Sequence, residues 1–362
     1  MIGERIYYYD IVKCIASYLI CLSHFGTLDV SLMGDRGSSI YFNNFILGLA
    51  SAGVPLFLMA NGSFLLNKSY PLSKILNRAK SFFVLYIIWG IITLLVLMPL
   101  YQDHYSIRHF LHAVFYQKAQ RTEHLWFMLA MVYIYLLFPF VKALYDKSEK
   151  VYITYLVVLI FLCTFGVELI DDVVNTSGYY LQSNTLKAFK IRHFVSFNPF
   201  NPWFAYTLFY FICGGLLAKH IQAIRVERAV LWGGILISLF ILFLFGLLNT
   251  TVREVEYDSV WSGQDTIMAM VMAFCVFVLC SKIKLHNPKL IAASKLVGLN
   301  TLGIYFIHVP LGFYLTTYYE KLTISKYFLA DIFYALLLMM LSLAISVLIK
   351  QIPIVKKLVQ IS

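Results

Sequence analysis

The stretch YYYDIVKCIASYLICLSHFGT, residues 7–27, decides the fold class of this chain. It is long enough to cross a bilayer, which requires about 20 mainly apolar residues. It nevertheless contains Asp10, Lys13 and His24. Ionisable side chains on a spanning helix are costly and usually face a cavity or a partner. The stretch therefore predicts a first membrane-spanning helix whose polar face is functional, or else a buried polar seam that packs helix against helix.

The polar residues of this stretch follow a helical spacing. Steps of four, three, four and three residues place on one stripe of the helix Asp10, Cys14, Ser17, Cys21 and His24. Lys13 and His24 are separated by about 16 Å along the axis at 1.5 Å per residue, so they cannot touch. Asp10 is placed to pair with Lys13. It is too far from His24 to form a Ser/His/Asp type of triad.

The composition describes an integral membrane protein. The 362 residues are 60% hydrophobic and only 13% charged, whereas soluble domains are about half apolar and one quarter charged. No segment of suitable length lacks apolar runs, so we predict a single membrane domain, residues 1–362, with no appended soluble domain. The six cysteines all fall in apolar segments. They are typical of small buried residues rather than of a disulfide framework.

The apolar runs predict an all-α fold of about ten transmembrane helices. The runs begin close to Tyr7, Ile40, Phe82, His124, Val151, Trp203, Val230, Asp265, Leu296 and Tyr327. An even number of helices places both termini on one side. With the N-terminus in the cytoplasm, 18 Lys and Arg lie on the inner side and 10 on the outer side. Both termini are therefore predicted to be cytoplasmic, and topology rather than nucleic-acid binding accounts for most of the net charge of +11.

Other polar residues fall at different depths of this predicted bundle. Lys74, Arg78 and Lys80, in the loop and at the start of the third helix, have no acid among them. Such a cluster suits phosphate groups, and the positive-inside rule explains it as well. Asn61 lies toward the cytoplasmic end of the second helix. His109 and His112 share a helical face, but they lack a third convergent ligand, so we predict no metal site.

Polar residues of the fourth and ninth helices complete a path across the membrane. His124 and Trp126 lie near the outer surface, and Tyr305 and His308 lie near mid-depth. Trp126 also fits an aromatic belt, and Tyr305 and His308 also fit a structural hydrogen-bonded pair. Basic groups inside, a polar middle and a histidine outside suit a substrate that is phosphorylated at its cytoplasmic end. A transporter and a membrane transferase both remain open on these residues.

The order of these segments resembles acyltransferase family 3 over nearly the whole chain. The similarity rests on six motifs in order: Asp10-x-x-Lys13 with His24, Gly53–Gly62, the basic segment with Arg78, His124–Phe127 leading to Tyr135 and Pro139, Tyr210–Gly214, and Gly303–His308. The resemblance implies transfer of an acyl group from cytoplasmic acyl-CoA to a hydroxyl, often on a cell-surface or exported glycan. No ATP site is expected, since the thioester supplies the driving force.

The resemblance also implies roles for individual residues. His24 would be the catalytic base, and the reference pKa of histidine, ~6.5, suits that role. Lys13 stands where the family has an arginine. With Lys74 and Arg78, it is expected to bind the cofactor. The expected supporting residues are Asp10, Asn61, His124, Trp126, Tyr305 and His308. Asn61-Gly62 replaces the Ser-Gly that often ends the second-helix motif.

The resulting hypothesis is a membrane O-acyltransferase in the cell (plasma or inner) membrane. The expected donor is acetyl-CoA, because no cationic group that would hold a charged acyl group is evident near His24 on the first helix. The expected acceptor is an extracytoplasmic or lipid-linked glycan. The partners are thus acyl-CoA, the glycan and membrane lipid, with neither nucleic acid nor metal. The alternatives are a multi-spanning carrier of a polysaccharide or lipid-linked intermediate, and a scaffold protein of envelope-polysaccharide assembly.

Overall fold

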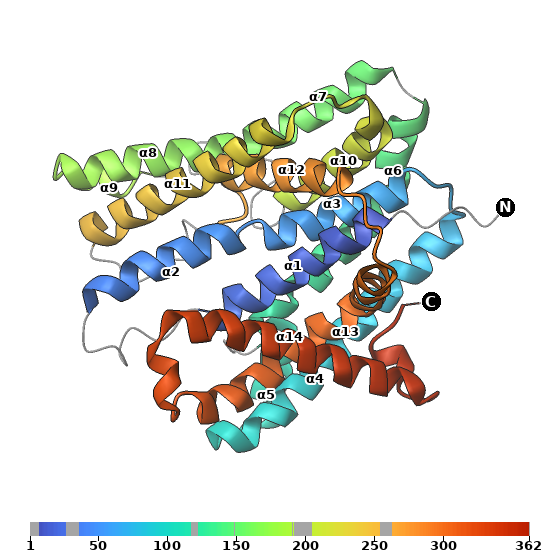
Figure 1. Ribbon diagram of the computed structural model, residues 1–362, viewed down its shortest axis with the longest axis vertical. Coiled ribbons are helices and arrows are strands. Elements are labelled where there is room, and N and C mark those ends of the chain that lie inside the picture. The colour runs from blue at the N-terminus through green and yellow to red at the C-terminus, as the bar shows by residue number, and fades with distance from the viewer. Residues whose placement is uncertain are drawn as a thin grey trace.

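The computed structural model describes residues 7–26, 36–116, 122–147, 149–189, 191, 205–253 and 263–361 (Figure 1). Within these ranges the secondary structure is entirely helical. Seven segments are long and apolar enough to cross a membrane: Tyr41–Leu66, Leu72–Tyr101, Glu123–Asp146, Lys150–Tyr180, Arg228–Leu248, Pro288–Tyr319 and Phe328–Gln351. The all-α membrane class predicted from the sequence is therefore confirmed.

Several of these segments contain more than one helical element. The first combines α2 (Arg36–Ala50) with α3 (Gly53–Leu66), and the third combines the 3-10 turn η2 (Glu123–Leu125) with α6 (Trp126–Lys147). The fourth consists of α7 (Lys150–Phe161), the π-helical turn η3 (Leu162–Gly166) and α8 (Val167–Tyr180). The other four are α4 (Leu72–Tyr101), α11 (Arg228–Arg253), α13 (Pro288–Tyr319) and α14 (Phe328–Gln351). The remaining short elements are α5 (Ile107–Tyr116), α9 (Asn184–Lys187), η5 (Ile221–Ala223), η7 (Thr323–Lys326) and η8 (Lys356–Leu358).

Three of the ten predicted segments form helices that are not among these seven. They are α1 (Tyr7–Phe25), α10 (Ala205–His220) and α12 (Ile267–Ser281). The predicted start of the sixth segment, at Trp203, lies outside the described residues. Two other starts were wrong, because α4 begins at Leu72 and α13 at Pro288, before the predicted Phe82 and Leu296. Their first turns carry polar and basic residues, and a search for apolar runs passes over such turns.

The polar stripe of α1 is largely a packing seam against α13. The Cys14 thiol lies 3.6 Å from the Ser294 carbonyl oxygen. Cys21 is buried in an apolar cluster that includes Ile304. At Gly298 a Cβ atom would overlap the carboxylate of Asp10, so a glycine there allows the two helices to approach closely. Most of the stripe therefore follows the structural alternative, and only its last member, His24, faces open space.

Helices α3 and α10 approach each other through paired glycines. A Cβ atom at Gly62 would overlap the Phe211 carbonyl oxygen, and one at Gly214 would overlap the Met59 backbone. The Ser63 hydroxyl lies 2.8 Å from the carbonyl oxygen of Gly214 and donates to it across the contact. Small residues with interhelical hydrogen bonds are the usual means of close packing inside membranes. The family-like motifs ending in Gly62 and Gly214 thus have a packing role.

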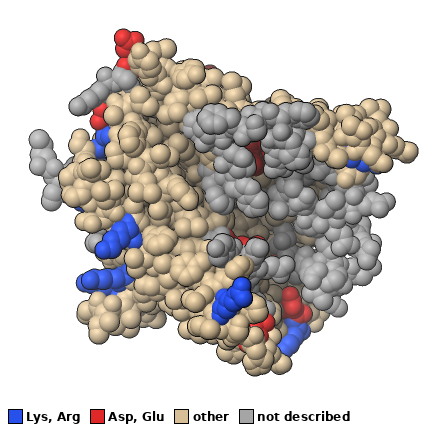
Figure 2. Space-filling view, turned by 180° about the vertical axis from the view of Figure 1, so that it is seen from behind, with Lys and Arg blue, Asp and Glu red and all other residues tan. Residues whose placement is uncertain are grey.

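The exterior agrees with a membrane environment. Figure 2 shows one face on which uncharged side chains cover most of the described surface and Lys and Arg are few. Many large apolar side chains are exposed on the outside of the bundle, among them Phe140, Phe240 and Phe333. In water such a surface would be unfavourable, whereas lipid chains accept it.

Candidate active site

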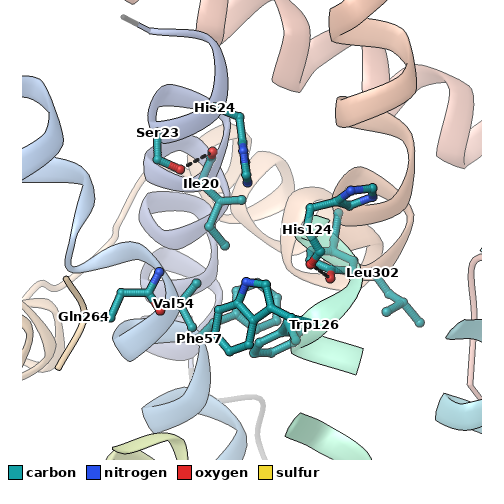
Figure 3. A pocket seen from close by; sticks show the side chains of 11 residues that line it. Ile20, Ser23, His24, Val54, Phe57, His124, Trp126, Gln264 and Leu302 are labelled. Atoms are coloured by element: carbon teal, nitrogen blue, oxygen red, sulfur yellow. Dashed lines mark hydrogen bonds between the residues drawn. The ribbon is translucent and has the colours of Figure 1, made fainter. Parts of the chain in front are cut away.

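A cavity of about 110 Å³ lies between α1, α3, the η2–α6 corner and α13. Its polar wall is formed by Ser23, His24, His124, Trp126, Gln264 and Tyr305 (Figure 3). Apolar side chains, among them Ile20, Val54, Phe57 and Leu302, line the rest. The structure thus brings four of the residues singled out from the sequence to one cavity: His24, His124, Trp126 and Tyr305.

His24 lies in the last turn of α1 and lines this cavity. Its side chain is exposed to solvent even though it lines the cavity. The neighbouring Ser23 hydroxyl donates to the Ile20 carbonyl oxygen at 2.8 Å, as the dashed line in Figure 3 marks. The imidazole of His24 is therefore the titratable group of α1 that a small substrate in the cavity can meet.

His308 of α13 is fully buried beside His24, with ring centroids 5.3 Å apart. Its Nδ1 lies 2.7 Å from the Tyr305 carbonyl oxygen and 3.1 Å from the Ile304 carbonyl oxygen. Both partners only accept hydrogen bonds, so Nδ1 carries the hydrogen. In the neutral ring Nε2 is then an acceptor, and it has no hydrogen-bond partner among the described residues. The predicted Tyr305–His308 bond therefore runs through the Tyr305 backbone rather than its hydroxyl.

Tyr305 ties α13 to the η2 turn. Its hydroxyl donates to the backbone carbonyl oxygen of His124. The ring of His124 lies 5.9 Å from that of Tyr305 and 6.1 Å from that of His308, measured between centroids. Because its hydroxyl hydrogen is engaged by a carbonyl, Tyr305 positions the turn that carries His124 and Trp126. It does not offer that hydrogen to a substrate.

Two nitrogen donors face the cavity from the side opposite α13. In Figure 3 the indole nitrogen of Trp126 and the amide nitrogen of Gln264 both point toward the side on which Ile20 and His24 lie. Tyr206 donates to the Gln264 side-chain oxygen at 2.9 Å, and Tyr210 donates to the Gln264 backbone oxygen at 2.7 Å. These two bonds from α10 fix the amide so that its NH₂ group is left for the cavity.

Gln264 was missed in the sequence. It precedes α12 and belongs to no motif, and the only local signal is an amide placed just before an apolar run. Asn61, by contrast, was expected at the site but does not line the cavity. It lies on α3 beside Gly62, in the region where α3 packs on α10. Asp10 and Lys13 also do not line the cavity. They lie nearer the N-terminal end of α1.

The predicted basic cluster is divided between two faces of α4. The guanidinium of Arg78 lies 4.9 Å from the centroid of Tyr70, and the ammonium of Lys74 lies 5.6 Å from it. The charge of Arg78 also lies close enough to interact with the Tyr135 hydroxyl. Lys80 is about 200° around the helix axis from Arg78. It therefore lies on another face of α4, where it lines a separate groove. These basic residues are on a helix from Leu72 onward, which corrects their predicted place in a loop.

The described residues contain no group of three His, Cys, Asp or Glu side chains arranged to hold a metal ion. The ring centroids of His24, His124 and His308 are between 5.3 and 6.1 Å apart where measured. Since Nδ1 of His308 is directed at backbone carbonyls, the cluster is better suited to handling protons than to ligating metal.

These features define a multi-pass α-helical membrane protein with a histidine-lined cavity inside the bundle. The chain belongs to acyltransferase family 3: the family's acyltransferase domain matches residues 6–351, nearly its whole length. It is therefore a membrane acyltransferase. No curated protein matches the chain. No solved structure matches it either.

Proposed function

We propose that this protein transfers an acetyl group from cytoplasmic acetyl-CoA to a hydroxyl of an extracytoplasmic or lipid-linked glycan, with His24 as the base. The observation that carries the proposal is the pairing of His24, which faces the cavity, with the acceptor nitrogen of His308 behind it. That arrangement suits a residue that must accept a proton from a substrate and return it.

The reaction needs one proton transfer in each direction. One ring nitrogen of His24 takes the hydroxyl proton as the glycan oxygen attacks the thioester carbonyl. The tetrahedral intermediate then collapses, the carbon–sulfur bond breaks, and CoA leaves as a thiolate that receives the proton from His24. The products are the O-acyl glycan and CoA. His308 Nε2 can accept a hydrogen bond from the other ring nitrogen of His24, which holds the ring in one tautomer and stabilises the imidazolium.

The tetrahedral intermediate carries a negative oxygen, which requires hydrogen-bond donors on the side of the cavity opposite His24. The Gln264 amide and the Trp126 indole both direct N–H groups into the cavity (Figure 3). Preorganised donors of this kind are usually the largest single contribution to acyl transfer. We assign Gln264 the stronger role because Tyr206 and Tyr210 hold it in place.

The proposed donor path begins at the other end of the bundle. Tyr70 with Lys74 and Arg78 combines an aromatic ring for the adenine with two cations for phosphates. Lys13 lies on α1, about 16 Å before His24 along the axis and at nearly the same angle around it. An extended pantetheine arm matches that span in length. The small cavity and the lack of Lys or Arg among its lining residues support acetyl over a larger or charged group.

The proposed orientation follows the charges. All ten predicted segments would cross the cell membrane with both termini in the cytoplasm, in agreement with the basic residues at the beginning of α4 and beyond α14. The alternative is a carrier that moves a glycan without chemistry. A carrier needs a passage for a sugar chain, which the cavity of about 110 Å³ between the described helices does not provide.

The test measures CoA release from acetyl-CoA by purified protein in nanodiscs, with a membrane glycan fraction as acceptor. Wild type should release CoA, and His24→Ala should not. The matched control is His286→Ala, which alters an exposed histidine away from the cavity and should behave like wild type. Equal release by wild type and His24→Ala would overturn the assignment of His24. Absence of acetyl-CoA binding to wild type would favour the carrier.

A further inference from the structure

The segment that follows α14, residues 352–361, is docked into the bundle although it lies beyond the family match of residues 6–351. The Trp89 indole nitrogen of α4 donates to the Leu358 carbonyl oxygen at 2.7 Å. Val359 is only 1% exposed and packs against Gly303 of α13. Trp89 itself stacks on Phe306, with centroids 4.8 Å apart and an angle of 4° between the rings. These contacts hold the segment against α4 and α13.

Between this segment and α4 lies a groove of about 510 Å³. Three of its lining residues are basic: Lys80 comes from α4, and Lys356 and Lys357 come from η8. Ser81 and Gln360 add neutral polar groups. None of the lining residues is acidic, and neither α4 nor residues 352–361 contain an Asp or Glu. The groove therefore concentrates positive charge that has no acidic partner within its walls.

The remaining wall of the groove is apolar. It is formed on α4 by Val84, Leu85 and Ile88 and is completed by Leu358 and Ile361. Val84 is 41% exposed and the neighbouring Phe83 is 43% exposed. This wall therefore continues onto the outer apolar surface of the helix. A ligand in the groove thus meets both ammonium groups and hydrocarbon side chains.

We propose that this groove is a binding site for an anionic phospholipid, with the headgroup phosphate held by Lys80, Lys356 and Lys357 and an acyl chain lying along Val84 and Ile88. Basic pockets between helices on the cytoplasmic side are suited to such headgroups. The nucleotide of CoA fits less well, because no aromatic side chain lines the groove to stack on adenine. Arg78, which lies beside the Tyr70 ring, is about 200° from Lys80 around α4, and that ring is the proposed place for the adenine.

The test counts the lipids that stay bound. Wild type and the triple variant Lys80→Gln/Lys356→Gln/Lys357→Gln are reconstituted in nanodiscs of mixed phosphatidylglycerol and phosphatidylcholine, released into detergent, and analysed by native mass spectrometry. Wild type should retain phosphatidylglycerol selectively. The triple variant should lose that selectivity, by about fivefold for each lysine removed. The charge-matched control is Lys284→Gln/Lys289→Gln/Lys295→Gln, which alters three exposed lysines outside the groove and should retain the lipid.

Two further measurements can overturn the proposal or identify the source of the phosphate. Equal phosphatidylglycerol retention by the groove variant and wild type would overturn it. Acetyl-CoA affinity measured in phosphatidylcholine alone separates the two sources of phosphate: a loss of affinity in the groove variant would assign the lysines to the nucleotide instead. The charge-conserving variant Lys80→Arg/Lys356→Arg/Lys357→Arg should retain the lipid. If it released the lipid as readily as the Gln variant, the positive charge would not be the cause.

Discussion

His308, the buried neighbour of His24, carries its hydrogen on Nδ1 and leaves Nε2 unprotonated, because both carbonyl oxygens near Nδ1 only accept hydrogen bonds. The two ring centroids are 5.3 Å apart. A buried acceptor beside a histidine that faces the cavity acts on its tautomer and on its charge after protonation. This relationship makes His308 a positioning residue in the proposed reaction.

Replacing His308 tests that role. We expect His308→Leu to lower kcat about 100-fold, the usual order for a displaced catalytic group, with little change in KM for acetyl-CoA. His308→Gln places an amide oxygen near the former Nε2 and should recover part of kcat. Steady-state CoA release over a range of pH measures both. Equal losses in the two variants, with identical pH profiles, would indicate that His308 only fills space.

Replacement of the proposed base, His24, should lower kcat further. We expect His24→Gln to lower kcat by about 10²- to 10⁴-fold, because glutamine preserves much of the volume but cannot take the proton. Binding of acetyl-CoA should be unchanged, as isothermal titration would show. An active His24→Gln protein would contradict the proposed mechanism even if His24→Ala were inactive through loss of packing.

The Gln264 amide is expected to stabilise the negative oxygen. Gln264→Leu should lower kcat about 10²- to 10³-fold. Tyr206→Phe, which removes only the bond that orients the amide, should have a smaller effect of about 10-fold. Because both act through one amide, the double variant should be no slower than Gln264→Leu. Additive losses in this double-mutant cycle would show that Tyr206 acts independently of Gln264.

The glycine contact between α3 and α10 predicts a loss of stability. At Gly62 an added methyl group meets the Phe211 backbone, which cannot yield as a flexible side chain does. We expect Gly62→Ala to destabilise the protein by about 1–3 kcal/mol through overpacking. Gly233→Ala on α11 is the control, since nothing lies within 4 Å of its Cβ position. Thermal unfolding in detergent compares them, and equal melting temperatures would contradict the close approach.

The attachment of residues 352–361 can be weakened at one atom. Trp89→Phe keeps an aromatic ring on Phe306 but removes the indole donor to Leu358. A lost hydrogen bond of about 1 kcal/mol should speed tryptic cleavage after Lys356 and Lys357 about fivefold. Trp232→Phe, at an exposed position on α11, should leave the cleavage rate unchanged. Cleavage rates that match in all three proteins would show that the indole bond does not hold the segment.

The helical period of the sequence shows which residues of α1 share a face, whereas contacts between helices show what each of those residues meets. The 3.6-residue period indicated that Cys14, Cys21 and His24 share a face, and the structure agrees. The period does not say what lies opposite. Cys14 and Cys21 meet α13, whereas His24 meets a cavity. Gln264 could not be found, because its importance comes from two tyrosines of another helix that hold it.

By itself the sequence determined the membrane class, the helical nature of the predicted segments and the residue types available for chemistry, because apolar length and helical period are local properties. Only the tertiary structure decided which side chains meet. It joined His24 to His308, directed Tyr305 to the His124 backbone, placed Lys80 in the groove beside residues 352–361 and left Asn61 away from the cavity. These outcomes depend on how helices distant in the sequence approach one another, and that approach depends on contacts such as those at Gly62, Gly214 and Gly298.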